Sequence, residues 1–297
     1  MTATIQTSNQ SLSFLGLNST KKAGRDKDAP YAFRPSGMAI LCLRGRCARY
    51  WGNSFSPFRM PEMNPTIDLL TSHRSIRKFT DEPIDPALFQ RLIEAGQAAA
   101  SSSFLQGVTI IRVTDPDKRA ALRAVANNQA YVEDAAEFLV FCADLSRPMR
   151  CCAQHGGEAA KGLTEQFIIA TVDTALYAQN LVIAAESAGL GICYIGALRN
   201  DPAKATEILG LPQQVYPVFG LCLGHPAQDP EVKPRLPVSV TLKENSYSTD
   251  GEDEAIADYD EAMRTYYANR SANIKVQGWS DQMAGLLGKE GRPHMLG

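Results

Sequence analysis

The catalytic motifs that this sequence lacks narrow its function before any residue is singled out. It contains no Walker phosphate-binding loop, no GxSxG nucleophile elbow and no HExxH zinc helix, so the commonest NTPase, serine-hydrolase and metalloprotease interpretations have no support. Its 7 cysteines form no CxxC pair, and its 4 histidines have no paired spacing with cysteine. We therefore expect no metal site and no disulfide framework, which favours a reducing, cytoplasmic setting.

A strong excess of one charge sign is also missing. The 297 residues carry 30 Lys and Arg against 32 Asp and Glu, which argues against nucleic acid or an anionic membrane as the partner. The apolar run 38–43 is too short to span a bilayer, and arginines follow it rather than precede it, unlike a secretory signal. Basic residues that matter should therefore be local and serve one small anionic ligand.

Residues 1–62 differ from the rest of the chain. Their first half is rich in Ser, Thr, Asn and Lys, with isolated apolar residues and no sustained period. We interpret them as a disordered or non-native extension ahead of a natural start at Met60 or Met63. An organelle transit peptide is the alternative. The remaining residues, 63–297, are long enough for one large domain with a buried core.

Periodicity from residue 65 onward predicts an α+β domain. Apolar residues at helical spacing predict helices over 65–71, 85–99, 117–126, 164–188, 202–209 and 253–269. Short β-branched or apolar runs predict strands over 108–113, 138–142, 192–195 and 215–224, with a further one over 238–242. The helix at 164–188 is apolar on nearly every side, so it should lie in the core. Its interior polar residues argue against a membrane span. The segment 144–162 shows no period and predicts a loop.

The glycines after the long helix invite comparison with a dinucleotide-binding loop. Gly189, Gly191 and Gly196 lack the GxGxxG spacing, and here the helix precedes the strand, whereas that fingerprint needs a strand, a glycine loop and a helix in this order. We therefore interpret Gly189 and Gly191 as a helix stop and turn. The small residues Gly196 and Ala197 would let the backbone approach a flat ligand closely, or would simply end the strand.

Two basic turns carry the candidate chemistry. The segment 73–77, HRSIR, holds two guanidinium groups, an imidazole and a hydroxyl in five residues, and the segment 233–235, KPR, lies far downstream. Guanidinium forks suit phosphate oxygens because two parallel N–H donors meet two acceptors. Each turn alone is compatible with a solvated surface; together they favour a phosphate site.

Four ordered segments resemble the oxygen-insensitive nitroreductase family, in its NADPH-dependent branch. They are HRSIR at 73–77, SSSFLQ at 101–106, YIG at 194–196 and KPRLP at 233–237, and the stretch 266–273, YYANRSAN, fits the same branch. The resemblance covers roughly 63–297. It implies an α+β fold with a mixed central sheet flanked by helices, FMN bound at the subunit interface, and an interlocked homodimer.

The resemblance also implies roles for particular residues. The implied FMN-binding residues are His73, Arg74, Ser75, Arg77, Ser101, Ser102, Ser103, Gln129, Tyr194, Ile195, Gly196, Ala197, Lys233 and Arg235. Of these, Arg77 would stabilise the reduced flavin, and the serines would reach the ring from the other subunit. Arg270 matches the family's NADPH-contact position, with Lys275 as a helper. No side chain is needed as a catalytic acid or base, because the redox chemistry belongs to the FMN.

The implied activity is a two-electron ping-pong transfer. NADPH would reduce the bound flavin and leave, and a small-molecule acceptor, a nitroaromatic, a quinone or free flavin, would then occupy the same slot. The alternatives are a non-catalytic flavin-binding or storage protein and an interaction module whose basic turns contact acidic partners. The sequence departs from the family at Ala197 and at Asn127 and Asn128, where glycines are usual, and its tail ends slightly early.

Overall fold

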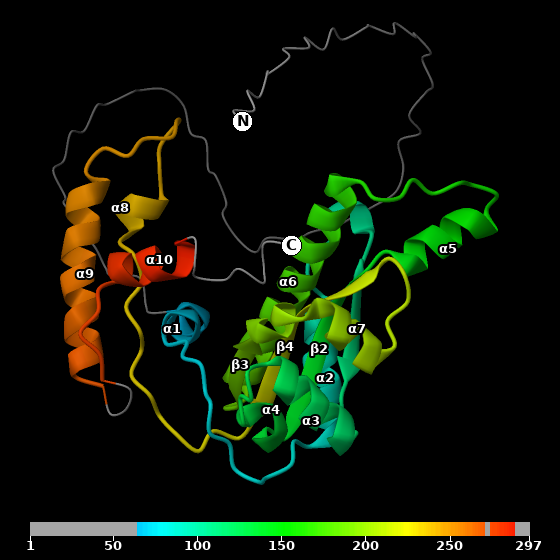
Figure 1. Ribbon diagram of the computed structural model, residues 1–297, viewed down its shortest axis with the longest axis horizontal. Coiled ribbons are helices and arrows are strands. Elements are labelled where there is room, and N and C mark those ends of the chain that lie inside the picture. Colours follow the sequence, from blue (N-terminus) through cyan, green and yellow to red (C-terminus); the bar gives the residue numbers. More distant parts are fainter. Residues whose placement is uncertain (1–63, 271–273, 289–297) are drawn as a thin grey trace, which may run out of the picture. The chain divides into compact units, whose positions relative to one another are not determined.

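The computed structural model describes residues 64–270 and 274–288, so the interpretation of residues 1–62 falls outside the described part of the chain. Its centre is a four-stranded sheet in the order β1-β2-β4-β3. The strands are β1 (Val108–Arg112), β2 (Glu137–Asp144), β3 (Gly191–Ile195) and β4 (Val215–Gly224). All three pairings among these described strands are antiparallel rather than in the mixed arrangement expected. The α+β class itself is confirmed (Figure 1).

Helices cover both faces of this sheet. Helices α3 (Pro116–Val125), α4 (Tyr131–Asp134) and α7 (Pro202–Leu209) supply residues to one core cluster, while α2 (Pro86–Gln97) and α6 (Thr164–Ser187) supply the other. Strand β2 is buried along its whole length and contributes alternate side chains to the two clusters. This is the two-residue period of a strand covered on both faces, and it explains why the sequence there reads as a continuous apolar run.

Four of the described helices begin in the same way, with an Asn or Asp cap followed by proline. Asn64, Asp85, Asp115 and Asp201 each accept a backbone N–H bond at the start of α1 (Pro65–Thr71), α2, α3 and α7, and each is followed by proline. The side chain satisfies an otherwise unpaired donor, and proline fits the first turn, which needs no N–H. These starts fall within one residue of those predicted from the sequence.

Helix α6 is the longest helix of the described residues and lies against the sheet. It is long and apolar enough to cross a membrane by length and composition only, a test that core helices of soluble proteins also pass. Its end has the expected glycine stop: Gly189 has a φ of +79°, and Leu190 N–H bonds back to the Ala185 carbonyl at 3.0 Å. That is the wrapping bond of a left-handed helix terminus, so the helix-stop interpretation of Gly189 is confirmed.

Two predicted elements differ from the structure. The predicted loop 144–162 contains helix α5 (Ser146–Gln154), and the predicted strand 238–242 is helix α8 (Val238–Thr241). Neither helix buries a residue, so neither imposes the apolar period that sequence patterns detect.

The rest of the described chain forms a C-terminal segment with a small core of its own. Helices α9 (Glu252–Ala268) and α10 (Trp279–Leu287) follow α8, and the buried residues Tyr259, Met263 and Tyr267 form a separate cluster. Asp260 accepts hydrogen bonds from the backbone N–H and the hydroxyl of Ser280, and thereby ties the start of α10 to α9. Two short 3-10 helices, η1 (Ser102–Phe104) and η2 (Gly196–Asn200), complete the elements.

Candidate functional site

The first basic turn is fixed to the sheet through one apolar residue. Ile76 donates its N–H to the Ile192 carbonyl at 2.8 Å and is only 5% exposed. A Cβ added at Gly191 would lie 2.7 Å from the Ile76 side chain, so glycine is required at that position of β3. The buried isoleucine holds the polar residues on either side of it, Ser75 and Arg77, at the rim of the fold.

The two basic turns meet in one cleft of about 440 Å³, here called the basic cleft. The residues that line it come from three separate segments of the chain. They are His73, Arg74, Ser75 and Arg77, then Pro230, Glu231, Lys233 and Arg235, and finally Tyr266, Tyr267, Arg270, Lys275 and Gln282. The structure thus brings together eight of the predicted site residues, including both predicted NADPH contacts. The convergence of distant cationic turns expected from the sequence is what the structure has.

Cations dominate the lining of the basic cleft. Lys233 lies over the Tyr267 ring at 5.5 Å from its centroid, and Arg270 lies 5.6 Å and 5.8 Å from the centroids of Tyr266 and Tyr267. The Arg270 Nε is buried without a hydrogen-bond partner among the described residues. An unsatisfied buried donor in a cation-rich cleft is costly unless an anion binds there. The donor set therefore fits a ligand with phosphate groups such as FMN or NADPH.

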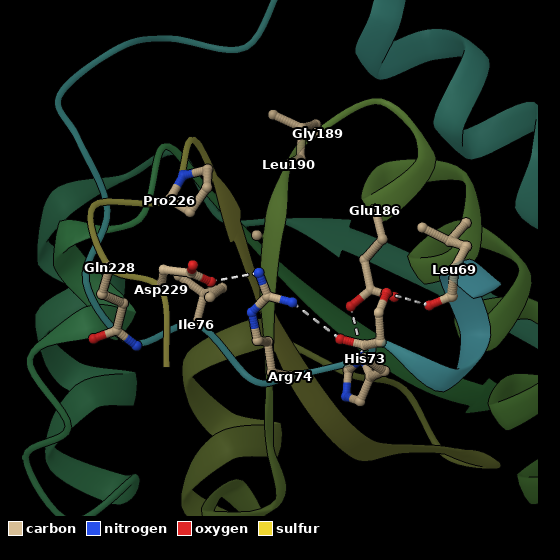
Figure 2. Close-up of a pocket in the computed structure, with 12 residues that line it drawn as sticks. Leu69, His73, Arg74, Ile76, Glu186, Gly189, Leu190, Pro226, Gln228 and Asp229 are labelled. Atoms are coloured by element: carbon tan, nitrogen blue, oxygen red, sulfur yellow. Dashed lines mark hydrogen bonds and ion pairs between the residues drawn. The ribbon is translucent and has the colours of Figure 1, made fainter. Parts of the chain in front are cut away.

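Carboxylates lie behind the first basic turn. Figure 2 shows a second cleft, of about 480 Å³, that shares His73 and Arg74 with the basic cleft. Here the His73 Nδ1 lies 2.6 Å from the Glu186 Oε1, and Arg74 forms an ion pair with Asp229. Arg74 also donates to the Ser72 carbonyl at 3.2 Å. The Glu186 side chain is 14% exposed and restricts His73, which lowers the entropic cost of organising it around an anion; the Asp229 side chain is 82% exposed and restricts Arg74 only weakly.

Arg77 lines the basic cleft and lies near Tyr131, the first residue of α4. Burial and the nearby Cys193 raise the pKa of Tyr131, and the guanidinium of Arg77 opposes that rise. Burial likewise raises the pKa of Tyr194 in β3. Both hydroxyls therefore stay protonated near neutral pH and act as hydrogen-bonding groups rather than as bases.

The predicted serines lie elsewhere in this chain. Residues 101–107, here called the serine loop, are outside the lining of the basic cleft, and Ser101 and Gln106 instead line a cleft of about 380 Å³ beside β1. A contribution of the serines to the other subunit's flavin, as the resemblance implies, agrees with this separation. Ser103 has a φ of 51°, which is unusual for a residue other than glycine. Surrounding contacts are needed to hold such a backbone conformation.

The remaining predicted contacts also lie outside the lining of the basic cleft. Ile195 is 1% exposed, so only its backbone is able to meet a ligand. Gln129 is half-buried in the turn before α4, and Tyr194 is the penultimate residue of β3, with its hydroxyl 3.5 Å from Gln179. Gly196 and Ala197 begin η2, and Ala197 packs against the core.

Local conformation explains one departure from the family pattern. Asn127 and Asn128 have φ values of 56° and 55°. Asparagine is among the residues that adopt this left-handed region with least strain. The pair therefore preserves the backbone course that glycines would give before Gln129.

Sequence reasoning missed several residues of the site. It did not single out Tyr266, Tyr267 or Gln282, which line the basic cleft, although the two tyrosines lie within a segment that it did identify. It also missed the carboxylates Glu186 and Asp229. The His73–Glu186 pair spans 113 positions of the chain, a separation that no local pattern reports.

The described residues form an α+β protein with an antiparallel sheet and a cation-lined cleft, whose donors suit a phosphorylated ligand. Two family models match the chain, "Nitroreductase family" over residues 70–225 and "Nitroreductase family, C-terminal domain" over residues 233–297. The chain belongs to the nitroreductase family, as the four sequence segments predicted.

Relatives of known sequence agree. Over 234 residues the chain is 51% identical to the "NADPH-flavin oxidoreductase" of Vibrio harveyi and 47% identical to the "Oxygen-insensitive NADPH nitroreductase" of Salmonella typhimurium, in each case covering 79% of this chain and 95% of the relative. The solved structure "NADPH:FMN oxidoreductase from Vibrio harveyi complexed with NAD+" matches with a TM-score of 0.71 and 48% identity, over 78% of this chain and 95% of that one. The "NfrA1 nitroreductase" structure from Bacillus subtilis matches with a TM-score of 0.73 and 41% identity, over 77% and 95%.

Proposed function

We propose that this protein is an NADPH-dependent oxidoreductase that holds FMN in the basic cleft and reduces nitroaromatics, quinones or free flavin. The observation that carries the proposal is the convergence of three cationic segments on one cleft. The names of the relatives, among them an NADPH-flavin oxidoreductase, an oxygen-insensitive NADPH nitroreductase and an "FMN reductase (NADPH)", support the choice of donor and cofactor. The acceptors share one chemical property, an electron-poor π system.

The phosphate of FMN would be held by the charged donors of the basic cleft. Arg74, Lys233 and Arg235 supply cations, and Ser75 and His73 supply further donors. Arg77 also lines the cleft and would stabilise negative charge on the reduced ring. When bound, FMN supplies a two-electron carrier between NADPH and the acceptor. The chain contributes binding, orientation and electrostatics.

Other predicted contacts would complete the flavin site. Gln129 would hydrogen-bond the flavin edge, and the backbone at the end of β3 would offer donors to the ring. That backbone comprises Tyr194, Ile195, Gly196 and Ala197. The hydroxyls of Ser102 and Ser103 and the N–H of Ser103 would come from the partner subunit; the Ser101 hydroxyl and the Ser102 N–H already donate to Asp173 within their own chain.

NADPH selectivity would depend on Arg270, with Lys275 nearby in the same cleft. A guanidinium suits the 2′-phosphate that distinguishes NADPH from NADH. Replacing Arg270 by Ala should lower the kcat/KM for NADPH by about tenfold or more, because a charge-assisted hydrogen bond is lost, and should leave NADH turnover almost unchanged. Steady-state kinetics with both donors measure this, with Arg91→Ala, an exposed arginine on α2, as the matched control. An equal loss with both donors would contradict the assignment.

The working unit would be an interlocked homodimer in the cytoplasm. Helix α6 exposes a row of large apolar side chains, and the serine loop of one chain is separate from its own basic cleft. The exposed residues on this helix and at its start are Leu163, Phe167, Ile168, Val172 and Leu176. A second copy that covers them would bring its serine loop toward the cleft. Burial of such a patch is a normal source of dimer stability.

Colour and bleaching test the proposal directly. The purified protein should be yellow with bound FMN, and anaerobic stopped-flow mixing with NADPH should bleach the visible flavin band within seconds. A yellow protein whose oxidised spectrum persists for minutes would instead identify the flavin-storage alternative. A colourless protein that takes up no added FMN would contradict both.

A further inference from the structure

Helix α6 carries a buried carboxylate that no role described so far uses. Asp173 is 3% exposed, and its helical neighbours Ala170, Thr174 and Tyr177 are buried as well. Burying an ionised group is costly unless hydrogen bonds replace the lost water. The partners of this carboxylate therefore show what it is retained for.

All the described hydrogen-bond partners of the Asp173 carboxylate belong to the serine loop. Ser101 Oγ donates to its Oδ2 at 2.5 Å, Ser102 N–H donates to its Oδ1 at 3.0 Å, and Gly107 N–H donates to Oδ2 at 3.3 Å. The Ser101 hydroxyl also accepts from the Gln106 N–H at 2.7 Å. One carboxylate thus ties the beginning of the loop to its end.

The loop needs such a tie because its backbone is unfavourable on its own. Ser103, Phe104 and Gln106 have φ values of 51°, 56° and 53°. This left-handed region disfavours residues other than glycine, and unlike the Asn pair these residues lack a strong preference for it. Phe104 is 79% exposed, so packing of its side chain within this chain does not hold the loop in place. Leu105 packs against a small core cluster, and the hydrogen bonds to Asp173 fix the two ends of the loop.

We propose that Asp173 is a positioning residue that fixes the serine loop in the conformation that meets FMN across the dimer. This inference rests on the proposed function. Val172, next to Asp173 on α6, is one of the exposed apolar residues of the proposed dimer surface. In this arrangement, α6 contacts the partner subunit with one side and the serine loop with the other. The position of the partner and the conformation of the loop therefore depend on the same helix.

An amide is a poor replacement for this carboxylate. The two oxygens of Asp173 accept from backbone N–H groups on both sides, Ser102 on Oδ1 and Gly107 on Oδ2. An asparagine in either orientation turns its own NH₂ group toward one of these donors. One buried N–H then loses its acceptor, which favours opening of the loop.

The test compares FMN binding by Asp173→Asn, Ser101→Ala and the double variant with that of the wild-type holoprotein. Apoprotein is titrated with FMN, binding is followed by quenching of flavin fluorescence, and the visible circular dichroism of the bound flavin reports its surroundings. Glu137→Gln is the matched control. Glu137 is also buried, and its carboxylate accepts a hydrogen bond from Arg112, but it lies at the start of β2 rather than on α6.

Asp173→Asn should weaken FMN binding by about tenfold, and Ser101→Ala by about threefold. The double variant should bind FMN no more weakly than Asp173→Asn, because both changes break the same contact between Asp173 and the serine loop. The dichroism of bound flavin should change in the variants and not in Glu137→Gln, whose affinity should stay within about twofold of wild type.

Two results would overturn the inference. One is wild-type affinity and dichroism in Asp173→Asn; the other, decisive if that variant does not fold, is wild-type affinity and dichroism in Ser101→Ala. Failure of the wild-type protein to bind FMN would instead reject the proposed function, so the two failures are distinct.

Discussion

At the scale of single residues, the cations of the basic cleft have acidic partners behind them. Glu186 is 14% exposed and lies against His73, and Asp229 pairs with Arg74 (Figure 2). A paired imidazole has one ring nitrogen committed to the carboxylate, which fixes the direction of the other. The basic turn is therefore organised before any anion arrives.

Replacing Glu186 by Gln should release His73 from this orientation. We expect FMN affinity to fall by about threefold to tenfold, the effect of losing one charge-assisted contact that is partly exposed. Fluorescence titration of the apoprotein measures the change. Glu82→Gln is the control, since Glu82 also lies near a histidine, His225, at 3.8 Å. Unchanged affinity in Glu186→Gln would show that the pair does not organise the cleft.

Sequence patterns could identify the cations of the site but not their buried partners. Arg74, Arg77 and Arg235 stand in short segments whose order along the chain matches a known family. Asp173 looked only like a polar residue inside an apolar helix, because the three donors that it accepts lie 66 to 72 positions away. Its meaning depends on a tertiary fold that local spacing does not encode.

At the scale of elements, α5 begins just after a hydrogen-bonding aspartate rather than at a run of apolar residues with helical spacing. Asp144 accepts from the Ser146 N–H at 2.9 Å, the Ser146 hydroxyl at 2.7 Å and the Thr109 hydroxyl at 2.6 Å. Burial raises the pKa of Asp144, but the hydrogen bonds from Thr109 and Ser146 outweigh it, and the pKa lies below its usual value. The ionised carboxylate is therefore the form that stabilises the folded protein.

Acid should remove this stabilisation. Because the folded-state pKa of Asp144 is below its unfolded value of about 3.9, its contribution is complete above that pH and is lost as the pH falls through the folded value. Asp144→Asn should cost about 1–3 kcal/mol at pH 7, lowering the Tm by about 2–4 °C per kcal/mol. The gap to wild type should close below about pH 4.

Thermal unfolding followed by circular dichroism between pH 7 and pH 3 gives this comparison. Asp81→Asn, which removes an exposed carboxylate, is the control. A gap that is the same at pH 7 and pH 3 would mean that ionisation of Asp144 does not contribute.

An element could be predicted where its sequence carries a local physical signal, such as a capping residue or an apolar run. Helices that begin with Asn or Asp followed by proline, such as α2 and α7, were placed within a residue. Strand β2 was found but was predicted too short, because its charged ends, Glu137 and Asp144, do not resemble buried strand residues. Both are buried through ion pairs and hydrogen bonds, and such pairing depends on neighbouring strands.

At the scale of the whole molecule, the exposed row on α6 predicts that assembly and cofactor binding go together. Replacing Ile168, which is 48% exposed, by Glu should place a charge in the proposed dimer surface, where desolvation of an unpaired charge costs several kcal/mol. We expect a monomer in size-exclusion chromatography with light scattering at about 10 µM, a concentration at which a dimer with a Kd near 1 nM remains intact.

The monomer should also lose its yellow colour on desalting. Ala120→Glu, which adds the same single charge at an exposed position of α3, should remain dimeric and yellow. A dimeric Ile168→Glu protein would place the interface elsewhere, and a monomer that retains FMN would show that one chain suffices for the cofactor.

The basic cleft has a consequence for how the protein matures in the cell. Its walls come from residues 73–77 near the start of the described chain and from residues 230–282 near its end. At a synthesis rate of ~5–20 residues per second, roughly ten seconds or more separate their emergence from the ribosome. The cleft therefore lacks part of its lining until residues 230–282 have been made, so it cannot hold an anion fully before then. A bound anion then joins two segments that are synthesised far apart in time, which adds to the stability of the folded chain.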